Sequence, residues 1–254
     1  MLTNSSHLFL LGILLMPLTA CRPAAHKVAP AETRIHPAAS LMTTTLPWLA
    51  LKDHFVATVG NNAGRGDAMG SLLVLADAMF APHSRFPMHA HREMEILSIV
   101  LDGELTHRGT LGDGTRLPAR SAQLISARDG MSHAEGNEGA ASTRMLQLWF
   151  TPDTLGGAPV YFQRSFRERA GRQLIAGDAT MPMRNSARVW WVDVQSGEDL
   201  SFETTSGRQG YLLAIDTALQ MGGATLPQGT GIEVLRGQAQ CKALSRGSLL
   251  WIEL

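Results

Sequence analysis

The sequence predicts an all-β protein of the barrel or sandwich type. Short β-prone runs recur along the chain, and Gly, Asp, Asn and Pro separate them. Turn signals such as Asp102-Gly103 and Asp129-Gly130 follow several runs, and helical patterns are few. Many short strands at this spacing are typical of barrels and sandwiches. Examples of these runs are 71–75, 95–101, 123–126, 145–150, 189–194, 211–215, 232–235 and 248–254.

Length and charge limit the organisation and the partners of the chain. Its 254 residues, 44% of them hydrophobic, suffice for one large or two modest β domains. Lys plus Arg equals Asp plus Glu, 22 of each, and no dense basic stretch is present. Because nucleic-acid binding depends on clustered cations that neutralise phosphates, we expect no nucleic-acid partner.

The first 21 residues resemble a secretion signal that ends at a lipidation site. The apolar stretch 8–20 is shorter than the roughly 20 residues of a spanning helix, but it suits the hydrophobic region of a signal. It ends in Leu-Thr-Ala followed by Cys21, which resembles a bacterial lipobox. We therefore expect a cell-envelope protein, periplasmic or anchored to the membrane only through lipid on Cys21. Because 1–21 contains no Lys or Arg, the alternatives are an uncleaved apolar tail and a misassigned start, which would make the protein cytoplasmic.

The next segment, 22–46, is rich in Ala, Pro and Thr and has no periodic pattern. This composition predicts a flexible tether, after which the folded body begins at residue 47. If Cys21 carries lipid, Cys241 is the only other cysteine and no internal disulfide forms. We expect Cys241 to be a small buried hydrophobe.

Two short polar patterns carry the chemistry. Side chains alternate faces along a strand, so His89 and His91 point the same way, and so do His133 and Glu135. Two such strands can bind one ion if they face each other across a barrel. Mixed nitrogen and oxygen ligation with open positions is typical of non-haem Fe(II) oxygenases, and imidazole also suits Zn, Cu and Ni. Glu95 shares the parity of His91 if that strand continues unbroken.

The alternative is structural, because a lone His-x-His pair usually consists of two surface or core histidines. The second pair, of mixed type, favours a metal site. No histidine follows His133, so the C-terminal half cannot build a histidine site. His107, beyond the Asp102-Gly103 turn, is expected to be structural or on the surface.

The motifs around these residues resemble those of the pirin family. Phe-Pro-Met-His-Ala-His-Arg-Glu-Met-Glu-Ile (86–96) is similar to its first metal strand, and Gly-Met-Ser-His-Ala-Glu-Gly-Asn (130–137) to its second. The resemblance covers 70–152 and extends over 47–69. Further matching segments are 100–108, 111–114 and 146–149.

The resemblance implies two stacked cupin barrels of the jelly-roll type with few short helices. A metal-binding cupin would occupy 47–152, and a cupin-like domain without metal would occupy 153–254. The implied ligands are His89, His91, His133 and Glu135, around one divalent ion. Fe(II) is the family expectation, with Zn, Cu, Ni or Mn as alternatives.

Broader cupins imply a competing ligand set. Besides the His-x-His pair, they use the glutamate of His-x-His-xxx-Glu, here Glu95, and a single histidine from the later strand, here His133. If Glu135 is the ligand, as the closer pirin match implies, Glu95 is a candidate for orienting a ligating imidazole from behind.

Two turns depart from the pirin pattern. Where pirins carry Pro-Gly-Asp, this chain has Ala119-Arg120-Ser121, and Arg128 stands where glycine is expected. Because glycine adopts positive φ at low cost, we expect both turns to take another shape.

The resemblance implies an activity of the quercetin 2,3-dioxygenase type, with a flavonol-like molecule and O₂ as substrates. The metal would hold adjacent substrate oxygens, and Glu135 would relay a hydroxyl proton as a base. The alternative is a non-catalytic envelope protein that senses metal or redox state or binds a small molecule. We expect a monomer.

Overall fold

The protein is described here by a computed structural model that covers residue 1 and residues 31–205 and 207–254. The expected signal and Cys21 lie outside the described residues. The regular structure of the described part is β-strand, apart from two 3₁₀ turns, η1 (Ala38–Ser40) and η2 (Gly60–Asn62). The predicted all-β class is therefore confirmed. Within the described ranges, no helix is long and apolar enough to cross a membrane.

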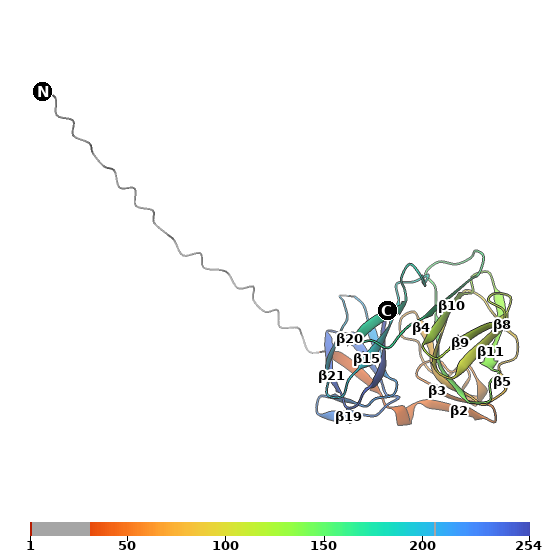
Figure 1. Ribbon diagram of the computed structural model, residues 1–254, viewed down its shortest axis with the longest axis horizontal. Coiled ribbons are helices and arrows are strands. Elements are labelled where there is room, and N and C mark those ends of the chain that lie inside the picture. The colour runs from red at the N-terminus through yellow and green to blue at the C-terminus, as the bar shows by residue number, and fades with distance from the viewer. Residues whose placement is uncertain (2–30, 206) are drawn as a thin grey trace.

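Two sheets form an N-terminal jelly roll (Figure 1). The larger sheet has the strand order β13-β10-β7-β12-β4-β3-β2, and the smaller has the order β5-β11-β8-β9, with β6 also paired to β11. Their bounds are β2 (Met42–Leu46), β3 (Leu49–Asp53), β4 (Leu72–Phe80), β5 (Ser84–Arg85), β6 (His89–His91), β7 (Glu95–Asp102), β8 (Glu104–Gly109), β9 (Thr115–Pro118), β10 (Ser121–Ser126), β11 (Met131–Asn137), β12 (Thr143–Phe150) and β13 (Val160–Ser165).

Two further sheets form a C-terminal jelly roll, with the orders β1-β20-β17-β22-β15-β14 and β16-β21-β18-β19. Cys241 lies in its interior, free and buried, and burial raises the pKa of its thiol to about 11, as expected for a small core residue. The strand bounds are β1 (Glu32–His36), β14 (Gly171–Ala176), β15 (Arg188–Val194), β16 (Asp199–Glu203), β17 (Gly210–Ala214), β18 (Leu219–Met221), β19 (Ala224–Leu226), β20 (Gly231–Arg236), β21 (Gln238–Ala243) and β22 (Gly247–Glu253).

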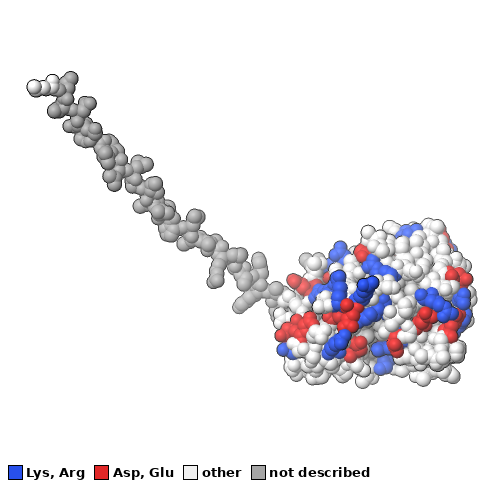
Figure 2. All heavy atoms as spheres, in the orientation of Figure 1, with Lys and Arg blue, Asp and Glu red and all other residues white. Residues whose placement is uncertain are grey.

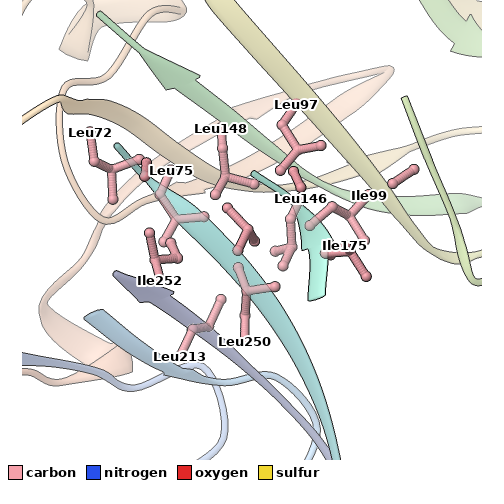
Figure 3. Packing of buried hydrophobic residues seen from close by; sticks show 14 of the residues in the cluster. Leu72, Leu75, Leu97, Ile99, Leu146, Leu148, Ile175, Leu213, Leu250 and Ile252 are labelled. Carbon is pink, nitrogen blue, oxygen red and sulfur yellow. The ribbon is translucent and has the colours of Figure 1, made fainter. Parts of the chain in front are cut away.

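The two large sheets share one apolar layer. Leu75, Leu97 and Leu148 from the N-terminal roll pack in one cluster with Leu213 and Leu250 from the C-terminal roll (Figure 3). Each large sheet therefore buries both faces, one in this layer and one inside its own roll, which explains why β7, β10 and β17 are almost entirely buried. Burial of each such side chain stabilises the fold by about 1.5–3 kcal/mol.

Charged side chains contribute less to stability. Figure 2 shows one face of the molecule, on which basic and acidic side chains lie interspersed. Exposed ion pairs include Arg116–Glu104 at 2.7 Å and Lys242–Asp199 at 3.2 Å. Such pairs are worth about 0–1 kcal/mol each, so the apolar layer dominates.

The chain crosses between the rolls at both ends of the N-terminal roll. β1 pairs with β20 of the C-terminal roll, whereas β2 pairs with β3 and β13 pairs with β10. The tether predicted over 22–46 is therefore wrong for residues 31–46, and both predicted domain boundaries are crossed. β1 has no apolar periodicity because it is an edge strand held by main-chain pairing and by Glu233, whose carboxylate lies 2.6 Å from His36 Nε2 and 3.2 Å from Arg34 Nη1.

The two turns that lack the expected glycine keep a left-handed backbone. Arg120 has φ 61° and Arg128 has φ 45°, so the expectation of another shape is wrong. A non-glycine residue in this region costs about 1–2 kcal/mol. The arginine side chains offset this cost: Arg128 Nη1 donates to Ala158 O at 3.0 Å, and Arg120 donates twice to Asp193, at 2.8 and 3.2 Å.

Asp193 is a buried acceptor at the margin of the shared layer. Besides Arg120, the indole Nε1 of Trp191 donates to it at 2.9 Å and the backbone N of Arg169 at 3.1 Å. Burial raises the pKa of this carboxyl, but the bonds from Arg120 and Trp191 outweigh it and hold the pKa below its usual value. Ionised Asp193 therefore stabilises the fold above the ordinary aspartate pKa of about 3.9, and this contribution is lost as pH falls.

We predict that Arg120→Met lowers the free energy of unfolding at pH 7 by about 2–3 kcal/mol. This is below the roughly 3–5 kcal/mol for a fully buried pair, because the Arg120 side chain is 30% exposed. The loss should shrink at pH 4 and below, where Asp193 of the variant protonates. Urea unfolding at both pH values measures it, with Arg85→Met, in an exposed pair with Glu138, as the control. Equal losses at both pH values would contradict the assignment.

Candidate metal centre

The two sequence motifs lie on neighbouring strands of the smaller N-terminal sheet. β6 pairs with β11 so that His89 is opposite His133. The predicted arrangement, two strands facing each other across a barrel, is therefore wrong. Directly opposed residues of an antiparallel pair share a face with Cβ atoms about 4.5–5.5 Å apart. The pairing thus brings the His-x-His and His-x-Glu patterns together on one face of one sheet.

Three imidazoles gather at this face. His89, His91 and His133 each offer a nitrogen, and these three atoms lie within 4.8 Å of one another. The ring centroids are 4.5 Å apart for His89 and His133, 4.8 Å for His89 and His91, and 4.9 Å for His91 and His133. Three imidazole nitrogens around one point form a donor set that suits divalent transition metals.

The unpaired nitrogens of this cluster fit a metal ion. His89 Nδ1 lies 2.9 Å from the carbonyl of Pro87, which can only accept, so Nδ1 carries the proton and Nε2 is left for a metal. Nε2 of His91 and both ring nitrogens of His133 are buried, and no described residue hydrogen-bonds them. An unsatisfied buried polar group costs about 1–3 kcal/mol. A metal ion would supply the missing partner.

The cluster favours neutral imidazole. Burial, together with the neighbouring His133 and His89, lowers the pKa of His91 to about 4. Burial lowers the pKa of His133 to about 3, with His89 and His107 adding to the effect. Both rings are therefore uncharged at neutral pH, the form in which histidine binds metals.

Glu135 lies next to His133, within 4.8 Å of one of its ring nitrogens, but it does not join the cluster of His89, His91 and His133. Polar groups of the opposite sheet hold its carboxylate. Its Oε1 accepts a hydrogen bond from Ser98 Oγ at 2.6 Å and another from Gln123 Nε2. Tyr161 OH donates to Gln123 Oε1 at 2.9 Å, which orients the amide so that its NH₂ group faces Glu135. Glu135 is 2% exposed. One carboxylate oxygen is thus fixed by donors, and the other remains for a metal or a proton.

Glu95 lies on the face of β7 that points away from the candidate centre. The chain turns at Glu93, which has φ 48°, so the strand parity expected from His91 does not continue. Glu95 shares its face with Leu97 in the layer between the rolls. Its carboxylate accepts from Ser126 Oγ and, at 3.4 Å, from the backbone N of Arg184, and burial raises its pKa against these bonds. The parity argument for Glu95 is wrong, and Glu95 joins neither group of candidate ligands among the described residues.

His107 is a site residue that the sequence did not reveal. It is fully buried, not on the surface, and it lies opposite Glu135 in the pairing of β8 with β11. A nitrogen of His107 groups with His133 and Glu135, again within 4.8 Å. Because side chains alternate faces along a strand, the apolar Leu105 two residues earlier indicated that His107 points inward. The pairing of His107 with Glu135 depends on residues far apart in the sequence, which a local pattern does not show. Ser98, Gln123 and Tyr161 gave no signal of their own.

A cavity of about 270 Å³ reaches the candidate centre. His89 and Glu135 form part of its wall, and Gln147 and Thr58 add polar groups. The indole Nε1 of Trp149 is buried without a partner among the described residues. The cavity is near the lower end of the roughly 300–1,000 Å³ of ligand pockets, which suits a small planar molecule. The other lining residues are Leu51, Val59, Val74, Ala76, Ala78, Phe86, Pro87, Met145 and Trp149.

Comparison with known proteins identifies the family. The family model described as Pirin matches residues 31–150. A pirin-like protein of Caulobacter vibrioides is 34% identical over 196 residues, which is 73% of this chain and 84% of that protein. The chain belongs to the pirin family. The match begins at residue 31, in agreement with the inclusion of 31–46 in the folded body of this pirin.

Two proteins of Escherichia coli also resemble the chain over most of its length. The quercetin 2,3-dioxygenase of Escherichia coli is 25% identical over 174 residues, which is 66% of this chain and 75% of that enzyme. The crystal structure of YhhW from Escherichia coli in complex with nickel(II) superposes with a TM-score of 0.80 at 22% identity, covering 88% of this chain and 99% of that chain. The superposition confirms the fold.

We predict different metal contents for variants of the two glutamates of this pirin. His133→Ala should weaken metal affinity more than about 100-fold, since loss of an outer partner alone costs about 10–100-fold. Glu135→Gln should weaken it as well, whereas Glu95→Gln, which faces the layer between the rolls, should bind like the unmodified protein. Metal analysis after dialysis against a chelator measures this. A Glu95→Gln variant that loses metal while Glu135→Gln keeps it would reverse the assignment.

Proposed function

We propose that this pirin holds one divalent metal ion through His89, His91, His133 and Glu135, and that it cleaves a flavonol-like substrate with dioxygen. The observation that carries the proposal is the cavity of about 270 Å³, mostly apolar, whose wall contains His89 and Glu135. A substrate in this cavity would lie next to the candidate ligands. The name of the related Escherichia coli enzyme, a quercetin 2,3-dioxygenase, supports the substrate class.

Three nitrogens and one carboxylate oxygen leave open positions on a six-coordinate ion. When bound, the ion would supply Lewis-acid polarisation and a template for the reacting oxygens. Fe(II) is our first candidate because the donor set is of the non-haem iron type. Nickel is an alternative, supported by the nickel(II) complex of YhhW, and Zn, Cu and Mn are further alternatives.

The protein groups around the cavity have separate tasks. The apolar walls, including Val74 and Met145, exclude water and contact the faces of a planar aromatic substrate. The indole Nε1 of Trp149, which has no partner within the described part of the chain, is a donor for a substrate oxygen. Glu135, with Oε1 fixed by Ser98 and Gln123, accepts the proton of a substrate hydroxyl at its other oxygen.

We predict that the metal-loaded protein consumes O₂ together with a flavonol. Glu135→Gln should lower the rate per bound metal by about 10²–10⁴-fold, the usual contribution of a general base, and Glu95→Gln should leave it unchanged. An oxygen electrode and the loss of flavonol absorbance measure the two substrates in parallel. If the fully metal-loaded protein turns over none of several polyphenols, this result would contradict the dioxygenase assignment and favour a non-catalytic sensor.

We also propose a cell-envelope location, on the strength of the sequence at 8–21 alone. Cells expressing a C-terminally tagged chain should carry it in the membrane fraction, and labelled fatty acid should be incorporated. Cys21→Ser should abolish the label and release the chain from the membrane. A chain found in the cytoplasm whether or not Cys21 is present would refute the lipid anchor.

A further inference from the structure

One ring nitrogen of His107 is hydrogen-bonded, and the other has no partner among the described residues. Its Nε2 lies 2.7 Å from the carbonyl of Leu111. A carbonyl oxygen only accepts, so Nε2 carries a proton and donates. In the neutral ring, Nδ1 then carries a lone pair and no proton. Nδ1 is buried, and no described residue hydrogen-bonds it. His107 therefore presents a pure acceptor inside the roll.

The surroundings of His107 hold its ring toward the candidate centre. The ring lies between Tyr161, with centroids 5.3 Å apart, and His133, with centroids 5.4 Å apart. Gly112 makes room for this packing, since a Cβ there would lie 2.8 Å from the Tyr161 ring. His107 is 0% exposed, so bulk solvent does not reach Nδ1.

A metal-bound His133 requires a hydrogen-bond acceptor of the kind that His107 presents. Both of its ring nitrogens are buried and unpaired among the described residues. When one nitrogen binds a metal, the other carries a proton and requires an acceptor, which also fixes which nitrogen is metallated. Glu135 Oε1 already accepts from Ser98 and Gln123. A nitrogen of His107 lies within 4.8 Å of a ligand atom of His133, and no described residue donates to its Nδ1.

We propose that His107 is a positioning residue: its Nδ1 accepts the N–H of His133 and so selects the His133 nitrogen that binds metal. This inference rests on the metal site of the proposed function but not on the dioxygenase activity. Most metal-bound histidines have such an outer partner, and its loss typically costs about 10–100-fold in metal affinity.

Two substitutions at this position separate the two nitrogens. In His107→Gln, the side-chain amide reaches the place of Nε2, so the bond to Leu111 is retained and the acceptor is lost. In His107→Asn, the amide oxygen takes the place of Nδ1, so the acceptor is retained and the bond to Leu111 is lost. A role through His133 and a role confined to the Leu111 turn thus predict opposite rankings.

The experiment is chelator competition with Zn(II) and Co(II) on the full chain, together with thermal unfolding without metal. We expect His107→Gln to weaken Zn(II) affinity about 10–100-fold and to change the visible Co(II) spectrum, with its unfolding temperature nearly unchanged. We expect His107→Asn to bind more tightly than His107→Gln despite a lower unfolding temperature. Wild-type affinity in His107→Gln, or equal losses in both variants, would overturn the proposal.

A direct observation complements the variants. With ¹⁵N-labelled histidine in the Zn(II)-loaded chain, we expect His107 protonated at Nε2 only, and a retained N–H on His133 coupled to His107 Nδ1. A proton on His107 Nδ1 would overturn the proposal. If His133→Ala binds Zn(II) as tightly as the unmodified chain, the metal site itself fails, whereas absence of flavonol turnover leaves these measurements unaffected.

Discussion

The structure depends on the apolar layer that the two large sheets share. Because one face of the seven-stranded sheet must fill this layer, alternation assigns each residue of β7 and β10 to one side. Leu97 enters the layer, and Ser98 points into the N-terminal roll and reaches Glu135. A shift of the strand register by one residue would turn every side chain of the strand to the other face, and the apolar side chains would leave the layer. The support of Glu135 is therefore fixed by hydrophobic packing.

The same layer accounts for the path of the chain. β1 pairs into the sheet of the C-terminal roll, and β13 pairs into that of the N-terminal roll. Each roll therefore includes a strand that lies outside the domain range predicted for it. At the margin of the layer, Arg120 offsets its left-handed backbone by binding Asp193 of the other roll. Local strain is thus compensated by a contact between the rolls, a contact that glycine at the same position would lack.

The candidate centre combines a small sheet that presents imidazoles with a large sheet that presents hydrogen-bond donors. Burial keeps His91 and His133 neutral, while Ser98 and Gln123 hold one oxygen of Glu135. Between the sheets, the cavity gives a small molecule access to His89 and Glu135. The small sheet thus carries the candidate ligands, and the large sheet carries the donors that hold Glu135.

The sequence by itself determined the all-β class, eight of the strands and the two candidate ligand motifs, because period-two alternation is a local property of the chain. It therefore placed His89 with His91 and His133 with Glu135. Only the tertiary structure decided that the two motifs are neighbours on β6 and β11, that the turn at Glu93 diverts Glu95, and that His107 joins the centre. The reason is physical: register between strands and the burial of a turn depend on contacts between residues far apart in the sequence, which a local pattern does not encode.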